Sequence, residues 1–214
     1  MQRTRVKICG LTRVQDVVSA CELGADAVGF VCCTTSPRFV DLDRLAQLAG
    51  AVAPLVTPVL LFVDARPSDV QRALQVVPNA LLQFHGSEDH AYCQSFRRPY
   101  LRAAAMGEGV DLLECERRFP SATALLADAG RAGSGGTGQV FDWSQMPAPA
   151  LRTLPLVLAG GLDAQNVEDA IGLVRPHAVD VSSGVEQTQG VKSWDRMRSF
   201  IAAVRRADAR SGTQ

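Results

Sequence analysis

The sequence lacks an excess of charge of either sign, long apolar runs and any block of basic residues. Its 214 residues include 22 Lys and Arg and 22 Asp and Glu, so the formal net charge is zero. We therefore expect neither nucleic acid nor an anionic membrane as a partner. No apolar run approaches the ~20 residues of a membrane span, and residues 1–6 lead into a strand pattern without the hydrophobic segment of a secretory signal. These absences predict a soluble protein.

The cysteine pattern also excludes two kinds of small, cross-linked protein. Six cysteines are scattered along the chain, and Cys32 and Cys33 are adjacent. Paired Cys-x-x-Cys motifs and Cys/His spacings, which are typical of zinc sites, are absent, so we expect no metal. Scattered cysteines in apolar segments are typical of reduced thiols rather than of a disulfide framework. The pattern therefore predicts a cytoplasmic protein.

What the sequence does contain is a repeated alternation of strand and helix patterns. The strand candidates begin roughly every 20 to 33 residues, which leaves room for one helix between neighbours. They span residues 6–9, 27–31, 58–64, 80–85, 100–104, 122–128, 155–159 and 178–182. Eight such units predict an α/β fold, a small single-domain (β/α)8 TIM barrel. We expect the barrel to cover residues 1–207 and a polar tail to cover 208–214.

The first intervening helix has the clearest boundaries. Thr12 is a candidate N-cap and Gly24 a candidate C-terminal stop. The apolar face predicted between them consists of Val14, Val17, Val18 and Cys21. The last helix, with apolar residues at 197, 200, 201 and 204, is predicted to close the ring.

Side-chain parity in the strands predicts where the chemistry lies. Alternate residues of a barrel strand face the helices or the interior, and on four strands the apolar parity suits the helix layer. The opposite parity holds Lys7 and Cys9, Gln83 and His85, Asp128, and Asp180 and Ser182. Barrel enzymes place their chemistry at the carboxyl ends of the strands. We therefore expect the side chains that end these strands to meet at one mouth.

Two apolar runs break into small residues near the end of the chain. The first ends at Gly160 and Gly161, and the second ends at Ser183 and Gly184. Small residues let backbone N–H groups approach an anion, and helix N-termini favour negative charge. The two turns together predict a phosphate cradle and a small phosphorylated substrate.

Each candidate also has a structural interpretation. Cys9 alone is more often a small buried apolar residue, and Arg38 in its Ser-Pro-Arg turn is equally compatible with solvent exposure. Asp128 could cap a helix, but residues 129–138 that follow are typical of a flexible loop. The glycine run 135–138 within it is typical of a mobile active-site loop. Only their joint placement at strand ends favours a catalytic interpretation.

Ordered motifs along nearly the whole chain resemble one known family, phosphoribosylanthranilate isomerase of tryptophan biosynthesis. They read VKICGLTR (6–13), GADAVGF (24–30), SPR (36–38), QFHG (83–86), GGTG (135–138), AGGL (159–162) and DVSSGVE (180–186). The resemblance implies a barrel that uses no metal or organic cofactor. It also implies an Amadori rearrangement of N-(5-phosphoribosyl)anthranilate to 1-(2-carboxyphenylamino)-1-deoxyribulose 5-phosphate. Phe84 and the run 32–35 depart from the family pattern, and the latter leaves the shape of the second loop open.

The resemblance also assigns roles to residues. It implies that Asp128 is the general acid and Cys9 the general base. Lys7, two residues before Cys9 on the same strand face, is expected to favour the thiolate. It implies a contact of Arg38 with the anthranilate carboxylate. Further substrate contacts are expected from Lys7, Gln83, His85, Gly136 and Asp180, and phosphate contacts from Gly160, Gly161, Ser183 and Gly184.

Three alternatives remain open from the sequence. The histidine-pathway isomerase performs the same chemistry on a larger bisphosphorylated substrate, but a carboxylate is expected there in place of Cys9. A barrel that binds phosphate without catalysis needs no acid and base at facing strand ends. An interaction protein needs an exposed apolar patch. The oligomeric state, monomer or homodimer, is also left open.

Overall fold

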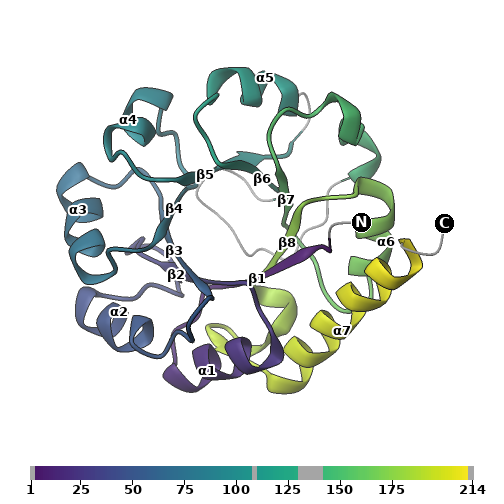
Figure 1. The fold of residues 1–214 in the computed structure, drawn as a ribbon. Coiled ribbons are helices and arrows are strands. Elements are labelled where there is room, and N and C mark those ends of the chain that lie inside the picture. Colours follow the sequence, from purple (N-terminus) through teal and green to yellow (C-terminus); the bar gives the residue numbers. More distant parts are fainter. Residues whose placement is uncertain (1–2, 108–109, 130–141, 212–214) are drawn as a thin grey trace.

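The computed structural model describes residues 3–107, 110–129 and 142–211, and eight parallel strands form a closed barrel at its centre (Figure 1). The strands pair in chain order, and β8 pairs with β1. Their bounds are β1 Arg5–Cys9, β2 Ala27–Val31, β3 Thr57–Phe62, β4 Leu81–Phe84, β5 Tyr100–Ala105, β6 Ala124–Asp128, β7 Leu156–Leu158 and β8 Ala178–Val181. The predicted single-domain (β/α)8 fold is confirmed.

Helices surround the barrel (Figure 1). They are α1 Val14–Leu23, α2 Leu42–Ala49, α3 Pro67–Val76, α4 His90–Ser95, α5 Leu112–Arg118, α6 Val167–Val174 and α7 Trp194–Ser211. In the described part of the connection between β6 and β7, two 3-10 turns, Trp143–Gln145 and Pro149–Leu151, take the place of an α-helix. No helix in the described ranges is long and apolar enough to cross a membrane.

The core has two layers, which explains the parity of the strands. Val6, Ile8, Leu82 and Val179 pack between the barrel and the helices, in the larger of two apolar clusters. The smaller cluster fills the barrel interior and contains Val59, Leu101, Ala103, Ala124, Leu126, Val157, Ala159 and Ala178. The polar residues of the inward set mostly line one cavity at the barrel end, as the parity predicts, namely Cys9, Gln83, His85, Asp128, Asp180 and Ser182.

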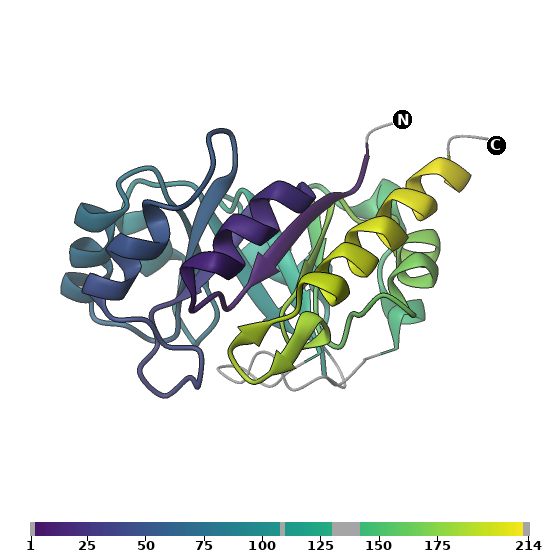
Figure 2. The same cartoon turned by 90° about the horizontal axis from the view of Figure 1, so that it is seen from below.

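A two-stranded hairpin that the sequence did not predict follows β8. Its strands are β9 Glu186–Thr188 and β10 Val191–Lys192. Figure 2 shows this hairpin at the lower edge of the molecule, where the barrel strands end, together with the loop that follows β2. The N and C labels lie at the opposite edge.

The start of α1 differs from the prediction because Thr12 contacts the hairpin. Thr12 does not cap the helix, because its hydroxyl donates to the Gly190 carbonyl at 2.6 Å. Arg13 occupies the N-cap position, with no side-chain cap hydrogen bond. Val18, predicted on the buried face, is 39% exposed, whereas Ala20 is fully buried there. The predicted cap is therefore wrong because Thr12 makes a tertiary contact. The predicted buried face is wrong at Val18, and Ala20 is buried instead.

The last helix differs from the prediction in its length. α7 continues to Ser211, so residues 208–211, expected to begin a polar tail, are helical. Asp208 accepts hydrogen bonds from the backbone N–H and the hydroxyl of Thr4. These hydrogen bonds attach the end of α7 to Thr4, the residue before β1.

Candidate active site

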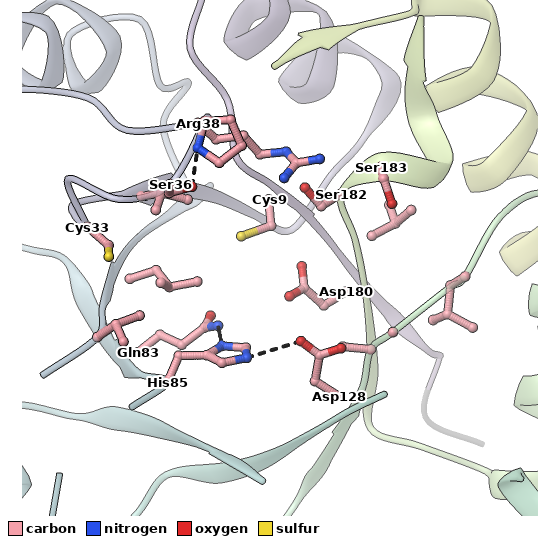
Figure 3. A pocket seen from close by; sticks show the side chains of 18 of the residues that line it. Cys9, Cys33, Ser36, Arg38, Gln83, His85, Asp128, Asp180, Ser182 and Ser183 are labelled. Carbon is pink, nitrogen blue, oxygen red and sulfur yellow. Dashed lines mark hydrogen bonds and ion pairs between the residues drawn. The ribbon is translucent and has the colours of Figure 1, made fainter. Parts of the chain in front are cut away.

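A cavity of about 390 Å³ lies at the carboxyl ends of the barrel strands. Most of the predicted site residues line it, namely Cys9, Arg38, Gln83, His85, Asp128, Gly160, Gly161, Asp180 and Ser183. Lys7 does not line the cavity but pairs with Asp180, which does, and Gly184 packs against the carbonyl of Leu162, another lining residue. Gly136 lies outside the described residues. Figure 3 shows Cys9 across the cavity from Asp128, with Asp180 between them.

A buried ion pair lies beside Cys9. Lys7 on β1 and Asp180 on β8 are directly opposed in the strand register. Lys7 Nζ donates to Asp180 Oδ2 at 2.9 Å, and the two side chains are only 4% and 9% exposed. The second oxygen, Oδ1, is buried and has no hydrogen-bond partner among the described residues. It is therefore available to a donor group in the cavity.

Burial and charge act in opposite directions on Cys9. Burial raises the pKa of the thiol and is the largest influence, and the charge of Asp180 raises it further. Lys7 and Lys192 lower this pKa, but the net direction is upward. The expectation that Lys7 favours the thiolate is therefore correct in sign, while burial outweighs it.

A neighbouring glycine provides the space for this thiol. Gly29 on β2 pairs with Cys9 in the sheet. A Cβ at Gly29 would lie 2.7 Å from Cys9 Sγ and 3.2 Å from Lys7 Nζ. Any side chain at this position would displace the sulfur or the ammonium group.

His85 connects Gln83 with Asp128. The Gln83 side-chain amide nitrogen lies 3.2 Å from His85 Nδ1. This contact from the neighbouring inward position of β4 holds one edge of the imidazole ring. Nε2 lies 3.1 Å from Asp128 Oδ2 (Figure 3). Asp128 ends β6 and is only 5% exposed.

Arg38 is held by an acidic residue that the sequence analysis did not select. Its Nε and Nη2 donate to the two carboxylate oxygens of Glu186 at 2.7 and 2.8 Å. Lys192 Nζ donates to Glu186 Oε1 at 2.8 Å. Burial raises the pKa of Glu186, but the hydrogen bond from Arg38 and the charge of Lys192 outweigh it, and the net pKa is lowered.

Glu186 and Lys192 were missed because their hairpin gives almost no sequence signal. The strands β9 and β10 have three and two residues, too few for an alternating pattern. Glu186 belongs to the DVSSGVE motif, which was the only available indication.

The two turns that the sequence predicts to hold a phosphate both border the cavity. Gly160 and Gly161 adopt φ angles of +82° and +64°, which glycine favours. Their N–H groups make no hydrogen bond to the described residues. The Asn166 side chain donates to the Gly161 carbonyl at 2.8 Å, just before α6. The second turn, Ser183–Val185, is a 3-10 helix, and a Cβ at Gly184 would overlap the Leu162 carbonyl.

This arrangement can bind a phosphorylated anion and move protons. Within the described ranges no group of three or more His, Cys, Asp and Glu residues is arranged to hold a metal ion. The cavity instead brings together a thiol, a carboxyl group, an imidazole and a guanidinium group. These are groups that act in general acid–base catalysis and in anion binding.

Comparisons with known proteins agree on one family. Residues 6–203 match the family model of N-(5'-phosphoribosyl)anthranilate isomerase. Two relatives bearing that name, from Leptothrix cholodnii and Methylibium petroleiphilum, are each 55% identical to this chain. The first alignment covers 98% of this chain and 94% of the relative, and the second covers 97% of each.

Solved structures give the same result. The phosphoribosylanthranilate isomerase of Thermotoga maritima is 35% identical with a TM-score of 0.84, covering 94% of this chain and 98% of that one. A structure of such an isomerase in complex with reduced 1-(o-carboxyphenylamino)-1-deoxyribulose 5-phosphate is 33% identical with a TM-score of 0.82, at the same coverage. The predicted resemblance is confirmed, and the chain belongs to the N-(5'-phosphoribosyl)anthranilate isomerase family.

Proposed function

We propose that this chain converts N-(5-phosphoribosyl)anthranilate into 1-(2-carboxyphenylamino)-1-deoxyribulose 5-phosphate in tryptophan biosynthesis, with Asp128 as general acid and Cys9 as general base. The observation that carries this proposal is the placement of both groups on one cavity, at the ends of β1 and β6. An Amadori rearrangement needs an acid at the ring oxygen and a base at C2 of the sugar. Two groups on facing strands meet this need.

The first step opens the furanose ring. Asp128 gives its proton to the ring oxygen as the C1–O bond breaks, and the amine nitrogen supplies the electron pair that forms the Schiff base. His85 holds the carboxyl group, because its Nε2 lies 3.1 Å from Oδ2. An orienting contact of this kind keeps the acid at a fixed position relative to the substrate.

The second step removes the C2 proton. The thiolate of Cys9 accepts it, and the C2–H electron pair forms the C1=C2 bond of an enol-amine while the Schiff-base nitrogen is neutralised. Return of a proton to C1 and loss of the hydroxyl proton at C2 give the ketone, so the overall reaction neither gains nor loses atoms. Lys7 and Lys192 both favour the thiolate against the effect of burial.

Substrate binding is assigned to the remaining polar groups of the site. Arg38 takes the anthranilate carboxylate, because a guanidinium group matches a carboxylate in geometry and charge. Gly160, Gly161, Ser183 and Gly184 take the phosphate. Lys7, Gln83, His85, Gly136 and Asp180 complete the contacts to the sugar and the aryl amine. A family member that binds a reduced product analogue supports this assignment.

The decisive test is a fluorescence assay with the purified protein. We expect the signal of N-(5-phosphoribosyl)anthranilate to disappear at a rate proportional to protein concentration, and mass spectrometry to find a product of unchanged mass. A protein that is folded by circular dichroism but leaves the signal unchanged would contradict the proposal.

We also propose a cellular location and an oligomeric state. We infer a cytoplasmic enzyme, supported by six free cysteines among the described residues, and a monomer or homodimer acting on a small molecule. A relative from Thermotoga maritima is described both as dimeric and as monomers. Light scattering coupled to size-exclusion chromatography distinguishes the two states here.

A further inference from the structure

Three buried charged side chains form one cluster between the loop after β2 and the β9–β10 hairpin. Side-chain exposures are 7% for Arg38, 6% for Glu186 and 0% for Lys192. One carboxylate between two cations leaves this charge cluster with a net charge of +1 at neutral pH. The nearby carboxylates of Asp16 and Asp180 are already paired, with Arg13 and Lys7.

The extra positive charge is directed to the cavity through Arg38. Lys192 is satisfied by its other contacts, because Nζ also donates to the carbonyl and the hydroxyl of Ser182 at 3.0 and 3.3 Å. Arg38, in contrast, lines the cavity. A buried charge without a partner is costly, so this edge of the cavity favours an anion.

Glu186 binds one edge of the Arg38 guanidinium group and leaves the other edge for a ligand. Glu186 binds Nε and Nη2, the side edge of the group. The end edge consists of Nη1 and the second N–H of Nη2, and Nη1 makes no hydrogen bond to the described residues. Two parallel N–H groups on this edge match the two oxygens of a second carboxylate.

Arg38 is also held along its stem. A Cβ at Gly10 would overlap Cδ of Arg38 and lie 3.3 Å from Nε, so the stem packs directly over the glycine backbone. The Arg38 backbone N–H donates to Ser36 Oγ at 3.1 Å. With the stem and the side edge both fixed, the guanidinium group has little rotational freedom.

Glu186 in turn is fixed by the hairpin and by α1. Glu186 and Lys192 are opposed across β9 and β10. The Lys192 backbone N–H donates to Asp16 Oδ2 at 3.0 Å, and Arg13 Nη2 donates to the Lys192 carbonyl at 3.2 Å. The hairpin is therefore attached to the start of α1, which follows directly after the strand that carries Cys9.

We propose that Glu186 is a positioning residue for substrate recognition: it occupies the side edge of Arg38, so that the end edge faces the aryl carboxylate of the substrate. Lys192 balances the charge of Glu186 and keeps the cluster positive. The hairpin thus determines how the enzyme selects an N-linked aromatic carboxylate over an uncharged aryl amine. This inference rests on the proposed isomerase function.

The test compares two ligands in binding titrations. One is reduced 1-(o-carboxyphenylamino)-1-deoxyribulose 5-phosphate, and the other is the same compound with phenyl in place of carboxyphenyl. Glu186→Gln leaves the charge cluster at +2, which favours an anion, but it also removes the carboxylate that fixes the guanidinium group. We expect the loss of positioning to dominate and to raise the Kd of the first ligand by ~10- to 100-fold, the range for a charge-assisted hydrogen bond. The Kd of the second ligand should not change. In turnover assays KM should rise, while kcat is largely kept, because chemistry occurs elsewhere.

Glu116→Gln is the matched control. Glu116 is also 6% exposed, and it accepts hydrogen bonds from Thr153 ahead of β7, at the opposite end of the barrel. This variant should lower the melting temperature without changing either Kd. If Glu186→Gln does not fold, the double variant Glu186→Gln/Lys192→Met removes the unpaired ammonium and keeps the cluster at +1, and the same ligand difference is expected from it.

Two results would overturn the inference. Equal losses of affinity for both ligands would show general damage to the cavity, and unchanged affinity of a folded variant would show that Arg38 needs no positioning. Failure of the proposed function gives a different outcome, because the unmodified protein would then show neither turnover nor binding of the carboxylated ligand.

Discussion

Replacing Asp128 by Asn tests the acid step with little change in shape. The amide has the size of the carboxyl group and keeps an oxygen beside His85 Nε2, which lies 3.1 Å from Asp128 Oδ2 in the structure. It cannot deliver a carboxylic proton to the ring oxygen. A general acid contributes ~10²–10⁴-fold, which corresponds to ~2.7–5.5 kcal/mol of activation free energy. We expect kcat to fall by this factor, with the Kd of the reduced product analogue nearly unchanged.

A substitution of His85 extends the same experiment. It contacts Asp128 through Nε2 and Gln83 through Nδ1, so replacing it by Asn should reduce kcat by misplacing the acid. In the Asp128→Asn background the same change should have little further effect. Coupling energies between contacting residues are ~0.5–3 kcal/mol, and a cycle of the two single variants and the double variant measures this quantity.

The assay combines kcat, ligand affinity and melting temperature for the four proteins of the cycle. An Asp128→Asn enzyme with near-normal kcat would refute the acid assignment. Additive losses from the two substitutions would refute the claim that His85 acts through Asp128. A large drop in melting temperature with activity retained would assign both residues to the stability of the barrel mouth instead.

Three further predictions concern the base and the phosphate cradle. Cys9→Ala should fold and bind the product analogue but lose ~10²–10⁴-fold in kcat; near-normal turnover would exclude Cys9 as the base. Because the pKa of Cys9 is raised, kcat/KM should rise with pH above neutrality. Lys7→Met should move this rise to still higher pH, because it removes a cation and leaves Asp180 unpaired. A shift of the rise to lower pH would contradict the assignment of Cys9 as base. Gly184→Val should weaken phosphate-analogue binding and also lower the melting temperature, because the side chain would overlap the Leu162 carbonyl; unchanged affinity would place the phosphate elsewhere.

The fold was predictable because its signals are local and repeated. Each strand shows an apolar parity that packs under a helix, as Ile8 and Val179 do, and eight repeats of that pattern leave few other architectures. The ends of helices were less predictable. Thr12 has the chemistry of an N-cap, but its hydroxyl binds Gly190, which lies 178 positions along the chain. No local pattern records a contact of this kind.

The site was predictable where parity and strand ends determine it. Cys9 and Asp128 end their strands on the inward parity, and the structure places both on the cavity. Partners that arrive from a short connection are different. A lysine at 192 in a polar stretch is typical of solvent exposure, yet its ammonium group is fully buried between Glu186 and Ser182. Only the three-dimensional pairing of the hairpin with Arg38 shows what it does.

The Lys7–Asp180 pair controls the charge beside Cys9, the proposed base. Burial alone lowers the pKa of Lys7, but the charges of Asp180 and Cys9 raise it to about 12. Without Asp180 the buried ammonium would lose much of its charge stabilisation, and with it the influence that lowers the pKa of Cys9. The same carboxylate raises the pKa of Cys9 directly. Asp180 thus keeps Lys7 charged, but it also makes Cys9 harder to ionise. Lys7 and Asp180 therefore act on the Cys9 thiol together.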